Sequence, residues 1–180
     1  MTSPQIPPEL EPVVAFHGHL CPGLLIGWRA SRMAMKLLNL SRDVDEEIVA
    51  VTENDACGVD AIQAVLGCTF GKGNLIFHDY GKQAFTVFRR DDGRGVRLVY
   101  RSPATRLSRD EAICRLLAEP DEALFDVKAP QEPIPQKAQI RDSARCSVCG
   151  EKVMATRLET CPDGRKVCIP CAEKLRRTTK

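Results

Sequence analysis

The chain has 180 residues, of which 43% are hydrophobic, 28% charged and 5% aromatic, and its formal net charge is +2. This length suits one ordinary domain with a small addition, and the hydrophobic fraction is too high for a disordered chain. No apolar run reaches the ~18 residues of a membrane-spanning helix. The N-terminal stretch MTSPQIPPEL lacks the basic patch and apolar core of a secretion signal, so we expect a cytoplasmic protein without a membrane partner.

Helical and strand patterns alternate through the first two thirds of the chain. Apolar side chains recur at helical spacing from Gly23 to Leu40, and residues 48–52 have the composition of a strand. Residues 55–66 indicate a helix that ends at Gly67, and residues 75–77 indicate a further buried strand.

A hairpin and a capped helix follow. Residues 84–88 and 96–101 are predicted to pair across a turn at Asp91-Asp92-Gly93. The capping box formed by Ser108 and Glu111 begins another helix. Helices interleaved with a mixed sheet predict an α+β or α/β domain.

A proline-rich segment separates this domain from the C-terminal region. Three prolines in six residues cannot lie in a helix and favour an extended spacer. We therefore expect a core domain over 1–129, a linker over 130–143 and a second domain over 144–180. Residues 137–180 hold 11 basic and 5 acidic residues, a net charge of +6.

Nine cysteines cannot form a closed set of intrachain disulfides, and in a reducing compartment such clusters are more often metal ligands or reactive thiols. Cys146-x2-Cys149 and Cys168-x2-Cys171, separated by eighteen residues, predict a tetrahedral zinc site. The alternative is two unrelated dithiols or redox pairs. A strand before Cys168 and a helix after it give the order of a treble-clef or zinc-ribbon finger. Cys161 is either a replacement ligand or a bystander thiol.

A second group of candidate ligands lies near the N-terminus. In an extended segment His17, His19 and Cys21 would alternate onto one face. Pro22 suits the first position of a helix, which would place Cys21 at a cap where the thiolate is favoured. The same argument applies to Cys57, which follows a strand and precedes a helix.

Histidine and cysteine ligands suit zinc or another late transition metal, and three protein ligands with a free fourth position describe a reactive site. The alternative is that His17 and His19 only make hydrogen bonds, while Cys57 and Cys68 are buried as small hydrophobic residues. The glycine-rich stretch 67–74 has the wrong spacing for a phosphate-binding P-loop.

Two lysines remain open candidates for ligand binding. Lys72 would supply the charge if the stretch 67–74 were a generic anion-binding loop. Lys82 and Tyr80 could face the same cleft. His78, isolated at a strand end, is the weakest histidine candidate.

These stretches resemble the FmdE-like proteins, a family named for one component of molybdenum formylmethanofuran dehydrogenase. The resemblance rests on FHGHLCPGLLIGWRA (16–30), NDACGVDAIQAVLGCTFGKGNL (54–75), DYGK (79–82) and the tail CSVCGE…GRKVCIPCAE. It implies a thioredoxin-like α+β core with a five-stranded mixed sheet, usually dimeric, followed by a treble-clef zinc finger.

Carried onto this chain, the resemblance implies a core site built from His17, His19, Cys21, Cys57 and Cys68, which can hold zinc in some members. It does not settle the activity.

We consider three functions. The first is a metal-dependent enzyme or accessory subunit in or beside molybdenum or tungsten redox metabolism, with redox-enzyme subunits as partners. Cys21 or Cys57 would be a thiolate ligand or nucleophile, and His17 or Asp55 would orient a ligand or move a proton. Cys68, Lys72 and Lys82 are the expected ligand-binding residues. We expect these three residues to contact a cofactor. We also expect a structural zinc in the finger, and a second zinc or other transition metal in the core.

The second function is a metal carrier or cofactor-insertion factor that uses the same thiols. The third is a regulatory or nucleic-acid-binding module built on the finger and the basic end Lys174–Arg177. A modest net charge and a tail without aromatic residues argue against nucleic acid.

Overall fold

A computed structural model describes residues 6–178 and divides the chain into two compact units. The first unit ends at Ala138 and the second begins at Gln139. Each unit has a hydrophobic core of its own.

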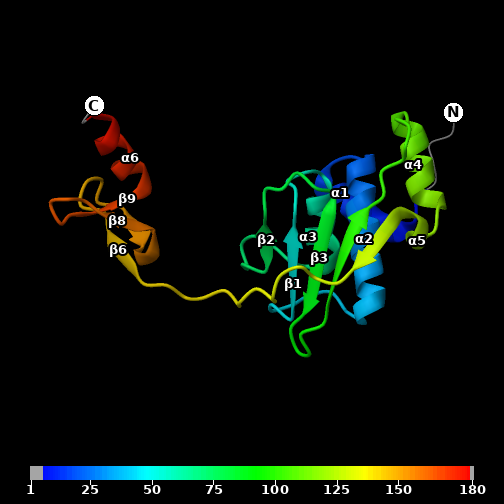
Figure 1. Ribbon diagram of the computed structural model, residues 1–180, viewed down its shortest axis with the longest axis horizontal. Coiled ribbons are helices and arrows are strands. Elements are labelled where there is room, and N and C mark those ends of the chain that lie inside the picture. The colour runs from blue at the N-terminus through cyan, green and yellow to red at the C-terminus, as the bar shows by residue number, and fades with distance from the viewer. Residues whose placement is uncertain (1–5, 179–180) are drawn as a thin grey trace. The chain divides into compact units, whose positions relative to one another are not determined.

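The first unit is built on a five-stranded mixed sheet with strand order β2-β1-β3-β4-β5 (Figure 1). Its strands are β1 (Ile48–Thr52), β2 (Leu75–Phe77), β3 (Ala84–Arg89), β4 (Gly95–Tyr100) and β5 (Phe125–Lys128). The pair β1–β2 is parallel and every other neighbouring pair is antiparallel. The prediction of an α+β domain with a mixed five-stranded sheet is confirmed.

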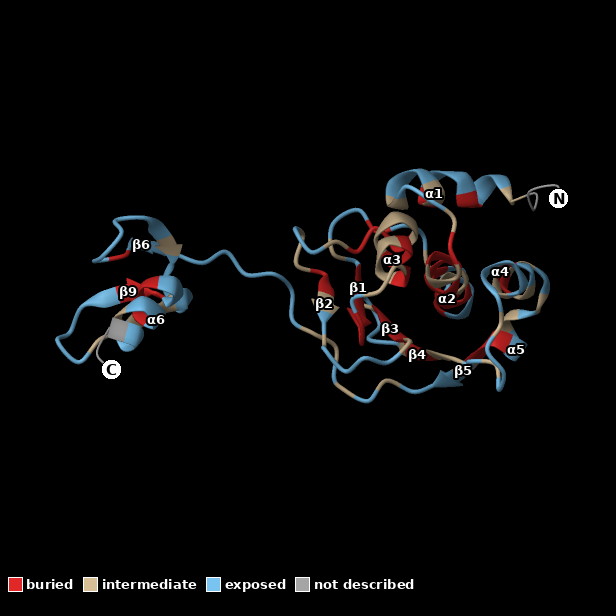
Figure 2. Ribbon diagram, turned by 90° about the horizontal axis from the view of Figure 1, so that it is seen from above, coloured by how far each residue is buried: buried red, intermediate tan, exposed pale blue. Residues whose placement is uncertain are grey.

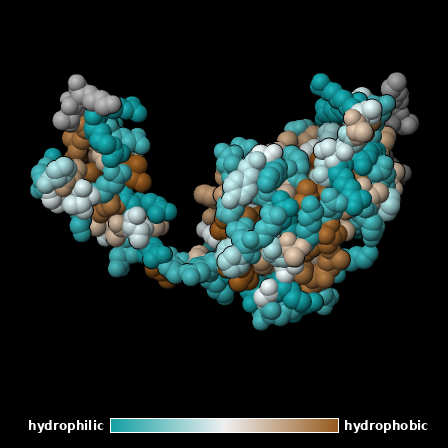
Figure 3. Space-filling view, viewed as in Figure 1, coloured by the Kyte–Doolittle hydropathy of each residue, from teal (hydrophilic) through white to brown (hydrophobic). Residues whose placement is uncertain are grey.

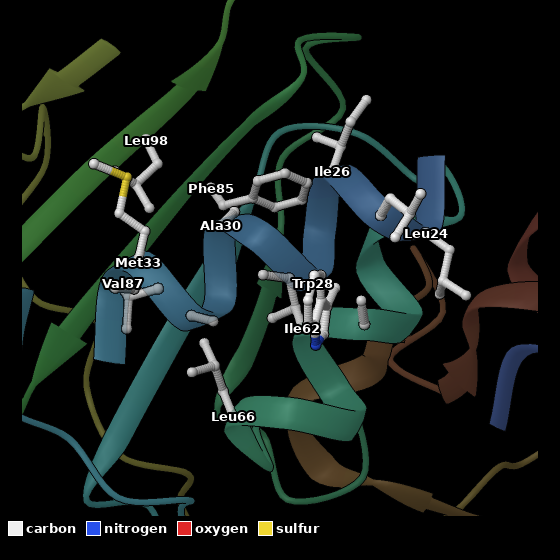
Figure 4. Close-up of a cluster of buried hydrophobic side chains, with 14 of the residues drawn as sticks. Leu24, Ile26, Trp28, Ala30, Met33, Ile62, Leu66, Phe85, Val87 and Leu98 are labelled. Carbon is white, nitrogen blue, oxygen red and sulfur yellow. The ribbon is translucent and has the colours of Figure 1, made fainter. Parts of the chain in front are cut away.

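The longer helices of this unit cover one face of the sheet (Figure 2). They are α1 (Glu11–His17, after a 3-10 turn at Pro8–Leu10), α2 (Pro22–Leu38), α3 (Gly58–Leu66) and α4 (Arg109–Ala118), with the short α5 (Asp121–Leu124) before β5. The core between them contains Leu24 and Trp28 of α2, Ile62 of α3, and Phe85 and Leu98 of the sheet (Figure 4). This packing explains the helical apolar spacing of residues 23–40.

Helices α2 and α3 approach each other closely at two glycines. A Cβ atom on Gly27 would lie 2.0 Å from the carbonyl oxygen of Gly58, so α2 does not tolerate a side chain at this crossing. The contact brings together the N-terminal ends of the two helices, which carry Cys21 and Cys57.

The opposite face of the sheet is covered by part of the proline-rich segment. Val49, Val51 and Phe88 are buried on this face, and Ile134 packs against them. Arg90 donates hydrogen bonds to the carbonyl oxygens of Pro135 and Gln136. Residues 130–136 therefore act as a cover over the sheet.

The second unit consists of two short hairpins and a helix. Strand β6 (Ser143–Arg145) pairs with β7 (Lys152–Met154), and β8 (Leu158–Thr160) pairs with β9 (Lys166–Cys168), after a 3-10 turn at Ala155–Arg157. Helix α6 (Ile169–Thr178) ends the described chain. The order of knuckle, hairpin and helix is that of a treble-clef finger.

Several local predictions are confirmed. The capping box of Ser108 and Glu111 begins α4, Gly67 ends α3 in a left-handed conformation, and the hairpin β3–β4 forms as expected. Helix α3 begins three residues later than predicted, because the Asn54 side chain accepts the N–H of Ala56 in a local turn. Helices α1 and α5 and strand β5 were not predicted.

None of the helices described within residues 6–178 is long and apolar enough to cross a membrane. On the face drawn in Figure 3, hydrophobic residues form patches within a largely hydrophilic surface.

Candidate metal centres

The four cysteines of the two C-x-x-C pairs converge in the second unit. The Sγ atoms of Cys146, Cys149, Cys168 and Cys171 all lie within 4.8 Å of one another. The first pair lies in the turn between β6 and β7, and the second lies where β9 passes into α6. Cys161 is outside this group, and its backbone N–H closes the β8–β9 turn by donating to Arg165 O at 2.8 Å.

The electrostatics of this cluster fit a divalent cation. Backbone amides, that of Cys149 first, lower the pKa of Cys146 to about 6, and the N–H groups of Val148 and Cys168 lie 3.4 and 3.3 Å from its sulfur. The neighbouring thiol of Cys168, followed by burial, raises the pKa of Cys171 to about 12. The protein alone thus stabilises the thiolate of Cys146. Four thiolates this close together require a cation to offset their charge.

A second group of donors meets in the first unit. One ring nitrogen of His17 and the sulfurs of Cys21 and Cys57 supply three ligand atoms that lie within 4.8 Å of one another. His17 is the last residue of α1, Cys21 is the N-cap of α2, and Cys57 immediately precedes α3. Three separate elements therefore build this core site.

Local backbone geometry places the first two of these ligands. Gly18 is left-handed (φ 96°) and ends α1, so the chain turns back and the His17 Nε2 atom lies 3.8 Å from the Cys21 sulfur. At the start of α2, the N–H of Leu24 donates to the Cys21 sulfur at 3.4 Å, and Pro22 occupies the first helical position. The predicted capping role of Cys21 is confirmed.

The carboxylate of Asp60 fixes the ring of His17. The His17 Nδ1 atom lies 2.7 Å from Asp60 Oδ2, and Gln63 Nε2 donates to Asp60 Oδ1 at 3.4 Å. Because a carboxylate accepts, Nδ1 is the donor in this bond, which leaves Nε2, 3.8 Å from the Cys21 sulfur, as the ring atom that can bind a metal. Such an outer carboxylate is typical of metal-ligating histidines. Asp60 was not predicted, although it lies three residues after Cys57 and so on the same side of α3.

Cys57 differs from its predicted state. Burial, followed by the adjacent Cys21, raises the pKa of its thiol. Its backbone is already helical and its side chain makes no capping hydrogen bond, so the prediction that the helix start favours the Cys57 thiolate is wrong. Without a cation, this thiol keeps its proton at neutral pH.

A hollow of about 440 Å³ lies beside the core site, where β1 and β2 end and α3 begins. His17, Cys57 and Asp60 form one side of this hollow, and Asp55 also lines it. The exposed rings of Phe70 and Phe77 contribute to its lining as well. His17 and Cys57 thus belong both to the group of donors and to the lining of the hollow.

Other predicted residues lie outside the core group. His19 is exposed, with its ring 4.6 Å from the ring of His17, because α1 and Gly18 replace the predicted extended segment. Cys68 is fully buried, and burial raises its pKa to about 12. Its buried, uncharged state matches the alternative of a small hydrophobic residue.

The two predicted lysines also lie away from the hollow. Lys72 forms an ion pair with the buried carboxylate of Asp43, so its charge is already neutralised and the anion-loop alternative loses its support. The Nζ atom of Lys82 lies 5.7 Å from the centre of the Tyr80 ring. Neither lysine lines the hollow as described within residues 6–178.

Comparison with known proteins agrees with this architecture. A family described as "FmdE, Molybdenum formylmethanofuran dehydrogenase operon" matches residues 16–126. The chain belongs to the FmdE family. Residues 140–177 match the prokaryotic dksA/traR C4-type zinc finger, so this FmdE protein carries a C-terminal zinc finger whose four cysteines are those converging above.

Two known proteins are similar to this FmdE protein over most of its length. A protein of Archaeoglobus fulgidus named "Probable S-adenosyl-L-methionine-binding protein" is 34% identical over 190 residues, which cover 87% of this chain and 50% of that protein. This chain thus spans about half the length of the curated relative it matches. The crystal structure of a tungsten formylmethanofuran dehydrogenase FmdE-like protein from Syntrophus aciditrophicus has the same fold. Its TM-score is 0.70 at 24% identity, with 92% of this chain and 91% of that chain covered.

Proposed function

We propose that the core site of this FmdE protein binds one zinc or other late transition-metal ion and acts on a small molecule held in the adjoining hollow. The observation that supports this most is the meeting of His17, Cys21 and Cys57 within 4.8 Å beside that hollow. A reactive zinc site usually has three protein ligands and a fourth position that a water or substrate can occupy.

The donor set suits such an ion. Two cysteine sulfurs and one imidazole nitrogen match the preferences of zinc and its neighbours. When bound there, the ion would supply Lewis acidity to a ligand oxygen or lower the pKa of a bound water. The remaining work falls to the chain, in which Asp60 keeps the Nε2 atom of His17 directed at the site.

Asp55 is the proposed proton acceptor. Its side chain lines the hollow, and within residues 6–178 its carboxylate makes neither a hydrogen bond nor an ion pair. An exposed and unpartnered carboxylate next to a metal site can take a proton from a bound ligand or water. Asp60 is less suited to this role because His17 occupies one of its oxygens.

The name of the Syntrophus relative favours a place beside molybdenum or tungsten redox enzymes. We propose such an enzyme, or an accessory subunit of one, as the context in which the core site acts. The predicted homodimer, the redox-enzyme partners and the cytoplasmic location stay predictions.

A metal carrier is the second candidate. The state of Cys57 favours it, because a half-buried thiol whose pKa is raised lets a proton compete with the metal and promotes release. Rapid transfer of the core metal to a chelator, with the finger keeping its zinc, would support the carrier over the enzyme.

Metal counting tests the proposal. Anaerobically purified protein should hold two metal ions per chain, and Cys57→Ala should hold one. Cobalt substitution should give thiolate charge-transfer bands from both sites, of which Cys57→Ala removes one set. Cys114→Ala is the matched control, since Cys114 is exposed on α4 and outside both groups. One ion per chain in the wild type, unchanged in Cys57→Ala, would refute the core site.

A further inference from the structure

We infer that the hollow beside the core site takes a small organic cation that carries a flat apolar group, and that it rejects anionic ligands such as phosphate esters. This inference deepens the proposed function by naming its ligand class, and it rests on that function only for the role of the metal.

The position of the hollow favours a ligand. It lies at the carboxyl ends of the two parallel strands β1 and β2, next to the start of the crossover helix α3. Clefts at the carboxyl ends of parallel strands are the usual ligand sites of such sheets. Thr52 and Phe77, the last residues of β1 and β2, line it, and buried Leu75 at the start of β2 adds to a mainly apolar lining.

Two aromatic rings favour a flat apolar group. Phe70 is 79% exposed and Phe77 is 44% exposed, although phenylalanine is usually buried. Both line the same hollow, and they come from different segments, the turn after Cys68 and the end of β2. Their faces can stack on a planar ligand and also attract a cation.

The charge of the hollow is negative. Asp55 and Asp60 line it, and no lysine or arginine of residues 6–178 does. A divalent ion together with the two thiolates that hold it would have a net charge of zero. A metal bound at the core site would therefore not offset the negative charge of these carboxylates. Asp60 is shared with His17, whereas the unpartnered Asp55 is free to pair with a ligand cation.

Three probes of similar size separate shape from charge: benzamidinium, benzamide and benzenesulfonate. The sulfonate is chosen as the anion because it is a poor metal ligand. Binding to the full metal-loaded chain is followed by NMR through the backbone amides of Ala56 and Val59, which line the hollow. We expect benzamidinium to bind about five- to tenfold more tightly than benzamide, and benzenesulfonate to bind more weakly than either.

Variants assign the preference to residues. Asp55→Asn should remove most of the advantage of benzamidinium while leaving the affinity for benzamide unchanged. Phe70→Ala should weaken benzamidinium and benzamide alike. Phe16→Ala should change neither, because Phe16 is an exposed ring of α1 that does not line the hollow.

Benzenesulfonate binding as tightly as benzamidinium, an unchanged preference in Asp55→Asn, or no binding of any probe would overturn the inference. Metal counting is independent of these outcomes. If the chain holds two metal ions but the hollow shows no preference for the cationic probe, the proposed function stands and this inference fails. If the hollow prefers the cationic probe but the chain holds only the finger zinc, this inference stands and the metal-dependent function fails.

Discussion

The imidazole of His17 and the carboxylate of Asp60, 43 residues apart in the chain, form a hydrogen bond of 2.7 Å that aims His17 at two cysteine sulfurs. This bond links the end of α1 to the first turn of α3. It makes the geometry of the core site depend on how these two helices pack.

Asp60→Asn should weaken metal binding at the core site by about 10- to 100-fold, because the amide no longer fixes the tautomer and orientation of His17. Chelator competition with cobalt or zinc measures the affinity. Asp126→Asn is the matched control, since its side chain is 39% exposed, as that of Asp60 is, and its ion pair with Arg101 lies on β5. An unchanged affinity in Asp60→Asn would remove the proposed positioning role.

Gly27→Ala should destabilise the first unit by about 3 kcal/mol, because the new methyl group would overlap the carbonyl of Gly58 and force α2 away from α3. Urea unfolding followed by Trp28 fluorescence reports on this unit, since Trp28 is the one tryptophan and lies in its core. Gly71→Ala should change stability by less than about 0.5 kcal/mol, as a Cβ there meets nothing within 4 Å. Equal stabilities would show that the crossing tolerates a side chain.

The buried pair Glu53–Arg97 should produce acid sensitivity. Arg97 donates two hydrogen bonds to Glu53, at 2.6 and 2.9 Å, and these lower the pKa of Glu53 from its ordinary value of 4.5. Ionised Glu53 therefore stabilises the fold at neutral pH, and the contribution is lost as the pH falls below about 4.5 towards the folded pKa.

Glu53→Gln removes this contribution and leaves the Arg97 charge buried, which should cost about 3 kcal/mol at pH 7. The slope of stability against pH below pH 5 should become shallower than in the wild type. Urea unfolding at several pH values measures both effects. Parallel curves for the two proteins would show that Glu53 does not carry the acid sensitivity.

Chelation of zinc should unfold residues 140–177 and leave the first unit folded. The buried residues of the finger are Cys146, Val167, Cys168, Cys171 and Ala172, so metal bonds replace a hydrophobic core there. NMR should show collapse of the finger resonances while Trp28 fluorescence is unchanged. Cys171→Ser should have the same effect, whereas Cys161→Ser should not. Unfolding by Cys161→Ser would instead make Cys161 a ligand.

Ile134→Ala should destabilise the first unit by about 1–2 kcal/mol, because Ile134 covers Val49, Val51 and Phe88 on the face of the sheet opposite the helices. Trp28 fluorescence during urea unfolding again gives the measurement. The matched control is Ile140→Ala, since Ile140 is fully exposed. If both variants unfold alike, the proline-rich segment does not contribute to the stability of the sheet.

Local patterns predicted the regular elements well. The helical spacing of residues 23–40, the capping box at Ser108 and the turn between β3 and β4 each depend on neighbours within a few residues. Helix α1 was missed because alternating His17 and His19 resemble an extended face. The short β5 forms only because β4 offers it an edge, which is a long-range contact.

For the metal centres, what the sequence could predict depended on how far apart the ligands lie along the chain. The sequence by itself determined the four-cysteine finger, because each C-x-x-C pair is a local turn whose spacing already directs two sulfurs to one point. Only the tertiary structure decided that His17, and not His19, meets Cys21 and Cys57. That choice depends on the left-handed turn at Gly18, the approach of Gly27 to Gly58 and the carboxylate of Asp60, and no local pattern encodes these contacts together.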